Sequence, residues 1–244
     1  MSEERLTVTT ASTQPFNCVI SLKAGSTFLR NLVWVLDHAQ PYSADNRSFP
    51  EQLPSREMTR EELAAEVSFF VLRDPIERFF SLYFDKAIGP EATRFGWISE
   101  TLKTNRTFHD GPSLTVEQHR ENCHALVLFV NARLNGHTEG PINPHWNRQI
   151  TRVHRALRFG LKPVLLEQLA PQLLQIAGGR IPPLQAALDM VKSRNRTPRI
   201  VAAKDILTPA LYADIAALYP EDIELYDLVK TGWDMLGHPP AIEL

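Results

Sequence analysis

The chain contains very little cysteine, and this scarcity argues against one class of protein. Cys18 and Cys123 are the only two cysteines among 244 residues, and neither belongs to a CxxC pair. Cys18 lies in an apolar run and Cys123 on the apolar side of a predicted helix, so we expect both to be buried as small hydrophobic side chains. A secreted domain held together by disulfides is therefore disfavoured.

Long apolar segments are also missing. No apolar run approaches the roughly 18 residues that a membrane-spanning helix needs. Residues 1–15 are polar and lack the apolar centre of a signal peptide. We therefore expect a soluble, cytoplasmic protein with no membrane partner, in which residues 1–15 form a flexible N-terminal segment.

Positive charge is not in excess. Lys and Arg number 26 against 28 Asp and Glu, which gives a net charge of −2. No global positive field therefore points to nucleic acid, and an anionic ligand would have to be held by local groups. With 43% hydrophobic and 22% charged residues, the composition is that of an ordinary globular protein. The length predicts a single domain over residues 1–244, and nothing indicates the oligomeric state.

Strands and helices alternate along the chain. An apolar, β-branched run at residues 16–22 predicts a buried strand, and the turn 23–27 then leads into a helix. A second strand, 67–72, is followed by Asp74 and Pro75, which are suited to the N-cap and first position of a helix. Residues 162–166 predict a third strand. This order predicts an α/β fold with a central parallel sheet and helices on both faces, an α/β/α arrangement of three layers.

The turn at residues 23–27 has the features of an anion site. A strand, a glycine-containing turn and a helix N-terminus direct free backbone N–H groups and the positive end of the helix at one point. Gly25 permits a close backbone approach, Ser26 and Thr27 add hydroxyl donors, and Lys23 can neutralise a negative charge. A well-capped turn with a solvated lysine is the alternative. In a parallel sheet, this turn and the one after residue 72 should lie at the same edge.

The order of residues in this turn differs from that of an ATP-binding P-loop. That motif reads GxxxxGK followed by Ser or Thr, and its lysine follows the second glycine. Here Lys23 precedes Gly25, and no second glycine lies four or five residues upstream. A nucleotide kinase or other phosphotransferase is therefore disfavoured, although a relaxed P-loop remains an alternative.

The second turn supplies another candidate anion ligand. Arg73, at the end of the second predicted strand, can donate two hydrogen bonds to one phosphate. Ser81 lies eight residues further on, just over two helical turns, and is expected on the side opposite the aromatic residues. The two side chains could close on one phosphate. In the alternative, Arg73 pairs with Asp74 or Glu77 and Ser81 is merely exposed.

Together these segments resemble a known family. KAGSTFLR is similar to the 5′-phosphosulfate loop of sulfotransferases that use PAPS (3′-phosphoadenosine 5′-phosphosulfate), and VLRDPIERFFSLYFDK is similar to their 3′-phosphate segment. The carbohydrate branch is the most similar, because a His-Trp motif occurs there about where residues 145–149 lie. VLLEQL and PEDIELYDLV also resemble segments of that branch. Arg148 departs from it, since proline is common at that place, and the usual membrane anchor is not seen.

The resemblance implies a P-loop-like fold and the transfer of a sulfonate group to an acceptor hydroxyl, on a carbohydrate or another small molecule, without a metal. The nucleotide donor would contact the residues of two segments: Lys23, Ala24, Gly25, Ser26, Thr27 and Phe28, with Arg73 and Ser81 on the 3′-phosphate that remains in the product, PAP. Lys23 would also stabilise charge on the leaving oxygen. His145 is the first candidate for the base, with His38 or a glutamate of residues 41–62 as alternatives.

Some expectations concern loops. A basic stretch at residues 192–199, with Asn195, resembles a family loop that closes over the nucleotide, although a solvated loop is the alternative. The acceptor pocket would come from residues 41–56, 89–112 and 135–146. A non-catalytic, nucleotide-binding member of the fold also remains open.

Overall fold

The computed structural model describes residues 3–45, 48–89, 96–105, 108–111, 113–136, 142–191 and 201–242. The sequence predicts one domain, and the chain packs as two compact units, each made from separate stretches of sequence. The first unit contains Met1–Arg73, Gln149–Arg196 and Glu224–Leu244, and the second contains Asp74–Arg148 and Thr197–Ile223.

The first unit is built on a five-stranded sheet with the order β3-β1-β2-β4-β5. Strands β2, β4 and β5 are parallel, whereas β1 runs antiparallel to both β2 and β3. The prediction of a parallel sheet is therefore correct for β2, β4 and β5 and wrong for β1, which is antiparallel to both of its neighbours. The strands are β1 (Leu6–Thr10), β2 (Phe16–Val19), β3 (Ser55–Met58), β4 (Val67–Leu72) and β5 (Lys162–Leu165).

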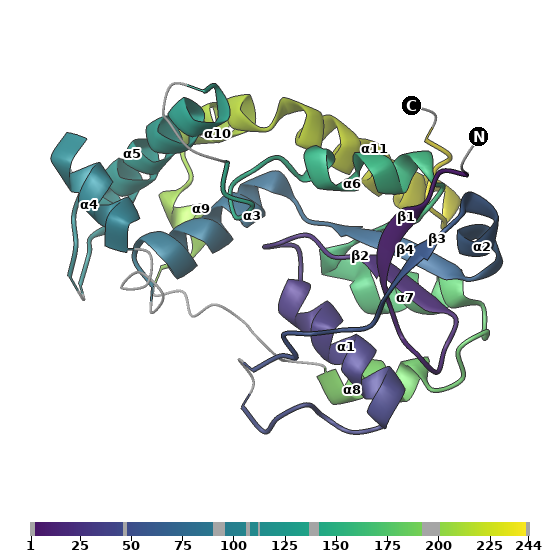
Figure 1. Cartoon of the computed structure of the whole chain (residues 1–244). Helices are drawn as coiled ribbons and strands as arrows, with labels where there is room; N and C mark the ends of the chain where they lie inside the picture. The colour runs from purple at the N-terminus through teal and green to yellow at the C-terminus, as the bar shows by residue number, and fades with distance from the viewer. Residues whose placement is uncertain are drawn as a thin grey trace. The chain divides into compact units, whose positions relative to one another are not determined.

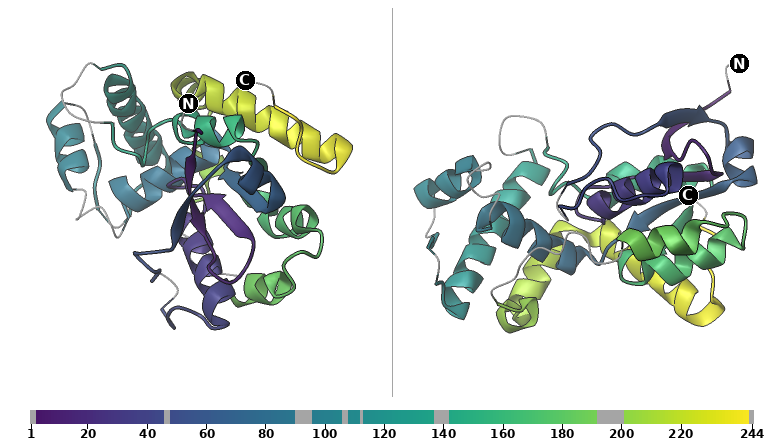
Figure 2. Two further views of the ribbon diagram at one scale, coloured as in Figure 1. Left: turned by 45° about the vertical axis from the view of Figure 1, so that its right-hand side comes forward. Right: turned by 90° about the horizontal axis from the view of Figure 1, so that it is seen from below.

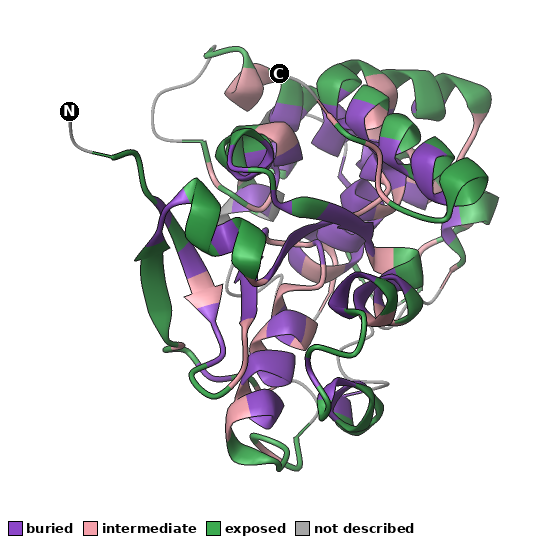
Figure 3. Ribbon diagram, turned by 90° about the vertical axis from the view of Figure 1, so that its right-hand side faces the viewer, coloured by how far each residue is buried: buried purple, intermediate pink, exposed green. Residues whose placement is uncertain are grey.

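Burial explains why some of these strands were predicted from the sequence. All six residues of β4 and all four of β2 are buried, as expected for parallel strands covered on both faces. Figure 3 shows these strands in the colour of buried residues, with exposed residues on the helices around them. In β3 only Met58 is buried, so this edge strand carries almost no hydrophobic signal.

The N-terminal segment is not the flexible tail that the sequence predicts. Residues Leu6–Thr10 form β1, in which Leu6, Val8 and Thr10 are buried and the residues between them are more exposed. This alternation anchors the segment between β2 and β3, because the buried side chains join the core of the unit.

Helices cover the sheet. Helices α1, α7 and α8 lie on one side of it, and α6 and α11 lie on the other (Figures 1 and 2). The helices of this unit are α1 (Ser26–His38), α2 (Arg60–Ala65), α6 (Gln149–Arg158), α7 (Leu169–Ala177), α8 (Leu184–Val191) and the greater part of α11 (Pro220–Leu236), with a short 3₁₀-helix η2 (Leu166–Gln168) after β5.

The second unit consists of helices. They are α3 (Pro75–Leu82), the π-helix η1 (Tyr83–Ala87), α4 (Gly96–Asn105), α5 (Val116–Leu134), α9 (Ala203–Ile206) and α10 (Pro209–Leu218). As predicted, Asp74 is the N-cap of α3 and Pro75 its first residue. Arg78 and Ser81 of α3 are both buried, so the alternative in which Ser81 is merely exposed is wrong.

The parallel register determines which turns share an edge of the sheet. Val19 of β2 pairs with Phe70 of β4, and Leu72 of β4 pairs with Leu165 of β5. The segments that follow these strands therefore leave the sheet at one edge, where ligands bind in open α/β sheets. They are the turn before α1, residue Arg73, and η2.

Candidate functional site

The turn between β2 and α1 presents an open helix N-terminus. Its N-cap, Gly25, lies in the left-handed region at φ 78° and contributes no side-chain cap, and the first turn holds no acidic residue. By contrast, α2, α3, α5 and α10 have their first N–H groups capped by Thr59, Asp74, Thr115 and Thr208. The first-turn N–H groups of α1 therefore have no side-chain cap, which suits them to an anionic ligand.

Gly25 is required at this position for two physical reasons. A Cβ at Gly25 would lie 2.6 Å from Cδ1 of Leu166, at the start of η2, and a positive φ strains any other L-residue. The turn therefore packs closely against Leu166, in the segment that follows β5.

We expect Gly25→Ala to destabilise the first unit more than Gly179→Ala does. Both glycines have φ 78°, but nothing lies within 4 Å of a Cβ at Gly179. Each substitution should cost about 1–2 kcal/mol from backbone strain, and rotation of the Leu166 side chain out of the way should add about 0.5–1.5 kcal/mol for Gly25→Ala alone. Chemical denaturation of both variants measures the difference. In a Leu166→Ala background, this extra cost should shrink, and equal losses at the two glycines would contradict the contact.

Lys23 and Arg73 are brought together. Arg73 donates from Nη1 to the backbone carbonyl of Lys23 at 3.1 Å. Lys23 itself is half-buried and has φ 63°, a left-handed conformation that is uncommon for a residue with a Cβ. This hydrogen bond joins the segments that follow β2 and β4. The alternative pairing of Arg73 with Asp74 or Glu77 stays a prediction.

Four more of the predicted donor-binding residues lie in or next to this turn. Ala24 is fully buried, Thr27 is buried at 8% exposure, and Ser26 and Phe28 are half-buried. Just before them, the Oγ of Ser21 is buried and has no hydrogen-bond partner in the described part of the chain. A buried hydroxyl without a partner costs free energy.

Gln149, the first residue of α6, has no separate role predicted from the sequence. Its side chain is 1% exposed and makes two hydrogen bonds with the backbone of Arg73. The N–H of Arg73 donates to Oε1 of Gln149 at 3.1 Å, and Nε2 of Gln149 donates to the carbonyl of Arg73 at 2.8 Å. The available signal was its place in the His-Trp motif of residues 145–149.

The segment after α1 returns to the first turns of that helix. Arg30 donates from Nη1 to the carbonyls of Pro50 and Glu51 at 3.0 and 2.9 Å, and Asn31 donates from Nδ2 to the carbonyl of Ser48 at 3.1 Å. These contacts hold residues 48–51 against α1 one helical turn from the anion-binding end.

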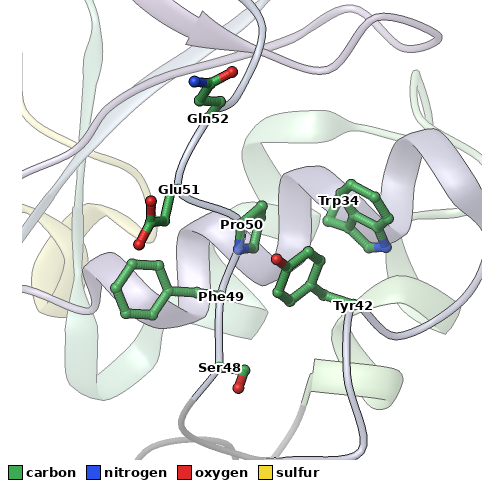
Figure 4. Close-up of a pocket in the computed structure, with 7 residues that line it drawn as sticks. All are labelled: Trp34, Tyr42, Ser48, Phe49, Pro50, Glu51 and Gln52. Carbon is green, nitrogen blue, oxygen red and sulfur yellow. The ribbon is translucent and has the colours of Figure 1, made fainter.

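A pocket opens beside this segment. It has a volume of about 600 Å³ and is lined by aromatic and polar side chains, drawn in Figure 4: Trp34, Tyr42, Ser48, Phe49, Pro50, Glu51 and Gln52. The Tyr42 ring meets Trp34 edge to face, with 5.0 Å between centroids. All of these residues belong to the 41–56 region expected to bind the acceptor, apart from Trp34 of α1.

His38 lies too far along α1 to act at the candidate anion-binding turn. It is the last residue of the helix that begins at Ser26. Twelve residues of α-helix span about 18 Å. Its ring stacks on Trp34, with centroids 3.7 Å apart, and its Nδ1 is 2.9 Å from the Trp34 carbonyl. His38 is therefore not a base for chemistry at the first turn.

The remaining predicted residues belong to the second unit. Ser81 is buried on α3 at 6% exposure. His145 is half-buried, and its backbone N–H and its Nδ1 both lie within 2.9 Å of Oδ1 of Asn143. Since that oxygen only accepts, Nδ1 of His145 carries a proton, and the lone pair of the neutral ring lies on Nε2.

Arg78 is a buried charge in this unit. It is buried at 4% exposure, its guanidinium is 6.0 Å from the centroid of the Tyr219 ring, and its Nη2 donates to the carbonyl of Pro144 at 3.4 Å. Burial lowers the pKa of Arg78, while the nearby Tyr219 and the fully buried Asp222 favour its charged form. The loop that precedes His145 is thereby tied to the buried charge.

Other predictions gave mixed outcomes. The loop 192–199, with Asn195, lies outside the described residues, as do parts of the predicted acceptor regions 89–112 and 135–146. Cys18 and Cys123 are buried free thiols, as predicted. Within the described ranges, no cluster of three or more His, Cys, Asp or Glu side chains could hold a metal ion. No helix among these residues has both the length and the apolar character for crossing a membrane.

Comparison with known proteins identifies the family of the chain. The model of the sulfotransferase family matches residues 15–228, which include both candidate anion-binding segments, the His-Trp motif and the first half of α11. No curated protein and no solved structure matches the chain. Because the match extends over far more than half of the sequence, the chain belongs to the sulfotransferase family.

Proposed function

We propose that the protein transfers a sulfonate group from PAPS to an acceptor hydroxyl. The observation that carries this proposal is the convergence at one sheet edge of the uncapped N-terminus of α1, Lys23 and Arg73. These groups supply local positive charge in a chain whose net charge is −2. We further propose that the fold is the P-loop-like, three-layer one that the family resemblance implies. The cytoplasmic location expected from the sequence stays a prediction.

The residues of the turn fit the 5′-phosphosulfate of the donor. The close approach at Gly25 leaves no room for a side chain, and the buried Ser21 hydroxyl would gain a partner if the turn closed on an anion. Backbone N–H groups of residues 24–28, with the hydroxyls of Ser26 and Thr27, would hold the phosphosulfate. Arg73 would bind the 3′-phosphate, and Ser81 is proposed as its partner in that role.

The proposed reaction is an in-line displacement at sulfur. PAPS supplies an activated sulfonate, whose bond to the 5′-phosphate oxygen breaks as a bond to the acceptor oxygen forms. Lys23 and the end of α1 would stabilise the negative charge that develops on the departing phosphate oxygen. A base takes the acceptor proton. Positive charge from these residues would serve in place of a metal ion.

His145 is proposed as this base. Its Nδ1 proton is engaged by Asn143, which leaves the lone pair on Nε2, the nitrogen that would accept the proton. Glu51 is the alternative, since its backbone is held to α1 by Arg30 and its side chain lines the pocket.

The pocket beside α1 is proposed to receive the acceptor. The Trp34, Tyr42 and Phe49 rings offer apolar surfaces for a ring, and Ser48, Glu51 and Gln52 offer hydrogen bonds to hydroxyl groups (Figure 4). Such a mixture suits a carbohydrate or another hydroxylated small molecule, in agreement with the carbohydrate branch that the sequence resembles.

Ligand choice tests the donor. We expect PAP, the desulfated product, to raise the thermal unfolding temperature of the purified protein, and ATP with Mg²⁺ to have little effect. Stabilisation by ATP–Mg²⁺ and not by PAP would instead support a nucleotide phosphotransferase. Incubation with PAPS and a library of hydroxyl compounds, followed by mass spectrometry, tests the transfer. PAP binding without sulfated product across that library would favour a non-catalytic, nucleotide-binding protein.

A further inference from the structure

Gln149 takes over the hydrogen bonding of β4 where its ladder ends. The last pair between β4 and β5 is Leu72 with Leu165, so Arg73 is the first residue beyond it. Gln149 then accepts from the N–H of Arg73 and donates to its carbonyl, like a neighbouring strand. An amide is required for this, because it offers a donor and an acceptor at one end of a neutral side chain.

The contact between Gln149 and the backbone of Arg73 is buried, so its loss would not be compensated by water. Gln149 is 1% exposed, so water is not available to replace it around the backbone of Arg73. Removing the amide would leave a donor and an acceptor unsatisfied in the interior, a state that folded proteins avoid. The backbone of Arg73 would shift to find other partners, and its side chain would move with it.

The side chain of Arg73 carries this constraint to the anion-binding turn. Its Nη1 donates to the carbonyl of Lys23, the residue held at φ 63°. Three residues are therefore connected in series: Gln149 fixes the backbone of Arg73, and Arg73 supports Lys23 in an uncommon conformation. All three belong to the first unit.

We propose that Gln149 is a positioning residue for donor binding, which aligns Arg73 and through it the turn of Lys23. The part that concerns the nucleotide rests on the proposed function. Gln149 itself need not touch the donor, so its loss should alter the affinity and order of the site rather than remove a reacting group.

A matched control is present in the second unit. Asn122 is fully buried and makes the same two bonds with the backbone of His109: Oδ1 accepts from its N–H at 2.7 Å, and Nδ2 donates to its carbonyl at 2.8 Å. Nδ2 of Asn122 also donates to the Tyr83 hydroxyl at 3.5 Å. Gln149→Leu and Asn122→Leu therefore remove similar buried clamps, of which only the first is connected to Arg73.

The experiment compares PAP with AMP, which lacks the 3′-phosphate, by calorimetry. We expect Gln149→Leu to lower the affinity for PAP about tenfold or more and the affinity for AMP less. The variant should also raise KM for PAPS more than it lowers kcat. Asn122→Leu should lower the unfolding temperature without changing the ratio of PAP to AMP affinity. A ratio that is unchanged in Gln149→Leu, or changed equally in both variants, would overturn the proposal.

The Gln149→Glu variant adds a test by pH. An ionised carboxylate cannot donate to the carbonyl of Arg73, whereas the protonated acid can both donate and accept, as the amide does. The ratio of PAP to AMP affinity, taken relative to the wild type at each pH, should recover as the pH falls and this carboxyl protonates. If Gln149 acted only by its size, the ratio of PAP to AMP affinity relative to the wild type would not change with pH. Such a result would contradict positioning by hydrogen bonds.

Hydrogen exchange without nucleotide separates this inference from the proposed function. Gln149→Leu should speed amide exchange in residues 21–28, and Asn122→Leu should not. Failure of the wild type to bind PAP would overturn the proposed donor, yet faster exchange in Gln149→Leu alone would still support the positioning role. Unchanged exchange in that segment would overturn the positioning role even if PAP binds.

Discussion

Lys23→Gly should strongly slow sulfonate transfer and leave the protein at least as stable as the wild type. Lys23 has φ 63°, and relief of left-handed backbone strain by glycine is worth on the order of 1 kcal/mol. The carbonyl that accepts from Arg73 belongs to the backbone, so this variant keeps it. The ammonium group is lost, and with it the proposed stabilisation of the leaving phosphate oxygen.

The size of the activity loss follows from the role assigned to the ammonium. Removing one preorganised group that stabilises charge in a transition state lowers kcat by about a hundredfold to a thousandfold. PAP affinity should fall much less, because backbone N–H groups at the end of α1 remain. Steady-state kinetics with PAPS and calorimetry with PAP measure the two effects separately.

Ala39→Gly is the matched control for this substitution. Ala39, the C-cap of α1, is the other described non-glycine residue with a positive φ, at 55°. Its replacement by glycine should stabilise the protein by a similar amount while activity stays at the wild-type level. If Lys23→Gly retained full kcat, or if it unfolded the protein where Ala39→Gly did not, the strained lysine would not be a catalytic group held at a cost in stability.

The sequence predicts those parts of the fold whose signals are local. The boundaries of β4 and the start of α3 at Pro75 follow from burial patterns and capping chemistry. Each of these signals is contained within a few neighbouring residues. The parallel part of the sheet follows in turn from the order of the strands.

The elements that the sequence did not predict depend on distant partners. Strand β3 has three exposed residues out of four and is defined by its register with β1, such as Leu6 with Met58. The burial of Arg78 is likewise decided by Tyr219 and Asp222, more than 130 residues further along the chain. The hydrophobic pattern of the sequence predicts neither the pairing of β3 with β1 nor the burial of Arg78.

The candidate site shows the same division. Lys23, Gly25 and Arg73 were identified because strand ends and turn residues mark them locally. Gln149 was not given its role, since a buried glutamine is recognised only when its backbone partner, 76 residues away in sequence, is known. The sequence leaves His38 as an alternative base, and the length of α1 places it far from the turn.

Arg73→Ala should lower the binding affinity for PAP far more than that for AMP. The two ligands share the adenosine and the 5′-phosphate and differ in the 3′-phosphate that Arg73 is proposed to bind. A charge-assisted hydrogen bond is worth about 1.5–3 kcal/mol, or roughly a tenfold to hundredfold change in PAP affinity. AMP should also lose some affinity, because Arg73 holds the carbonyl of Lys23 and the turn loosens without it.

The comparison with other arginine variants separates the two roles of Arg73. Arg73→Lys keeps a positive charge without the planar guanidinium, and it should recover part of the PAP affinity. Arg180→Ala is the structural control, because Arg180 also donates to backbone carbonyls in the first unit, those of Ile176 and Ala177. It should reduce stability and leave both affinities unchanged. Equal losses of PAP and AMP in Arg73→Ala would refute the 3′-phosphate contact and leave Arg73 as a support of the Lys23 turn alone.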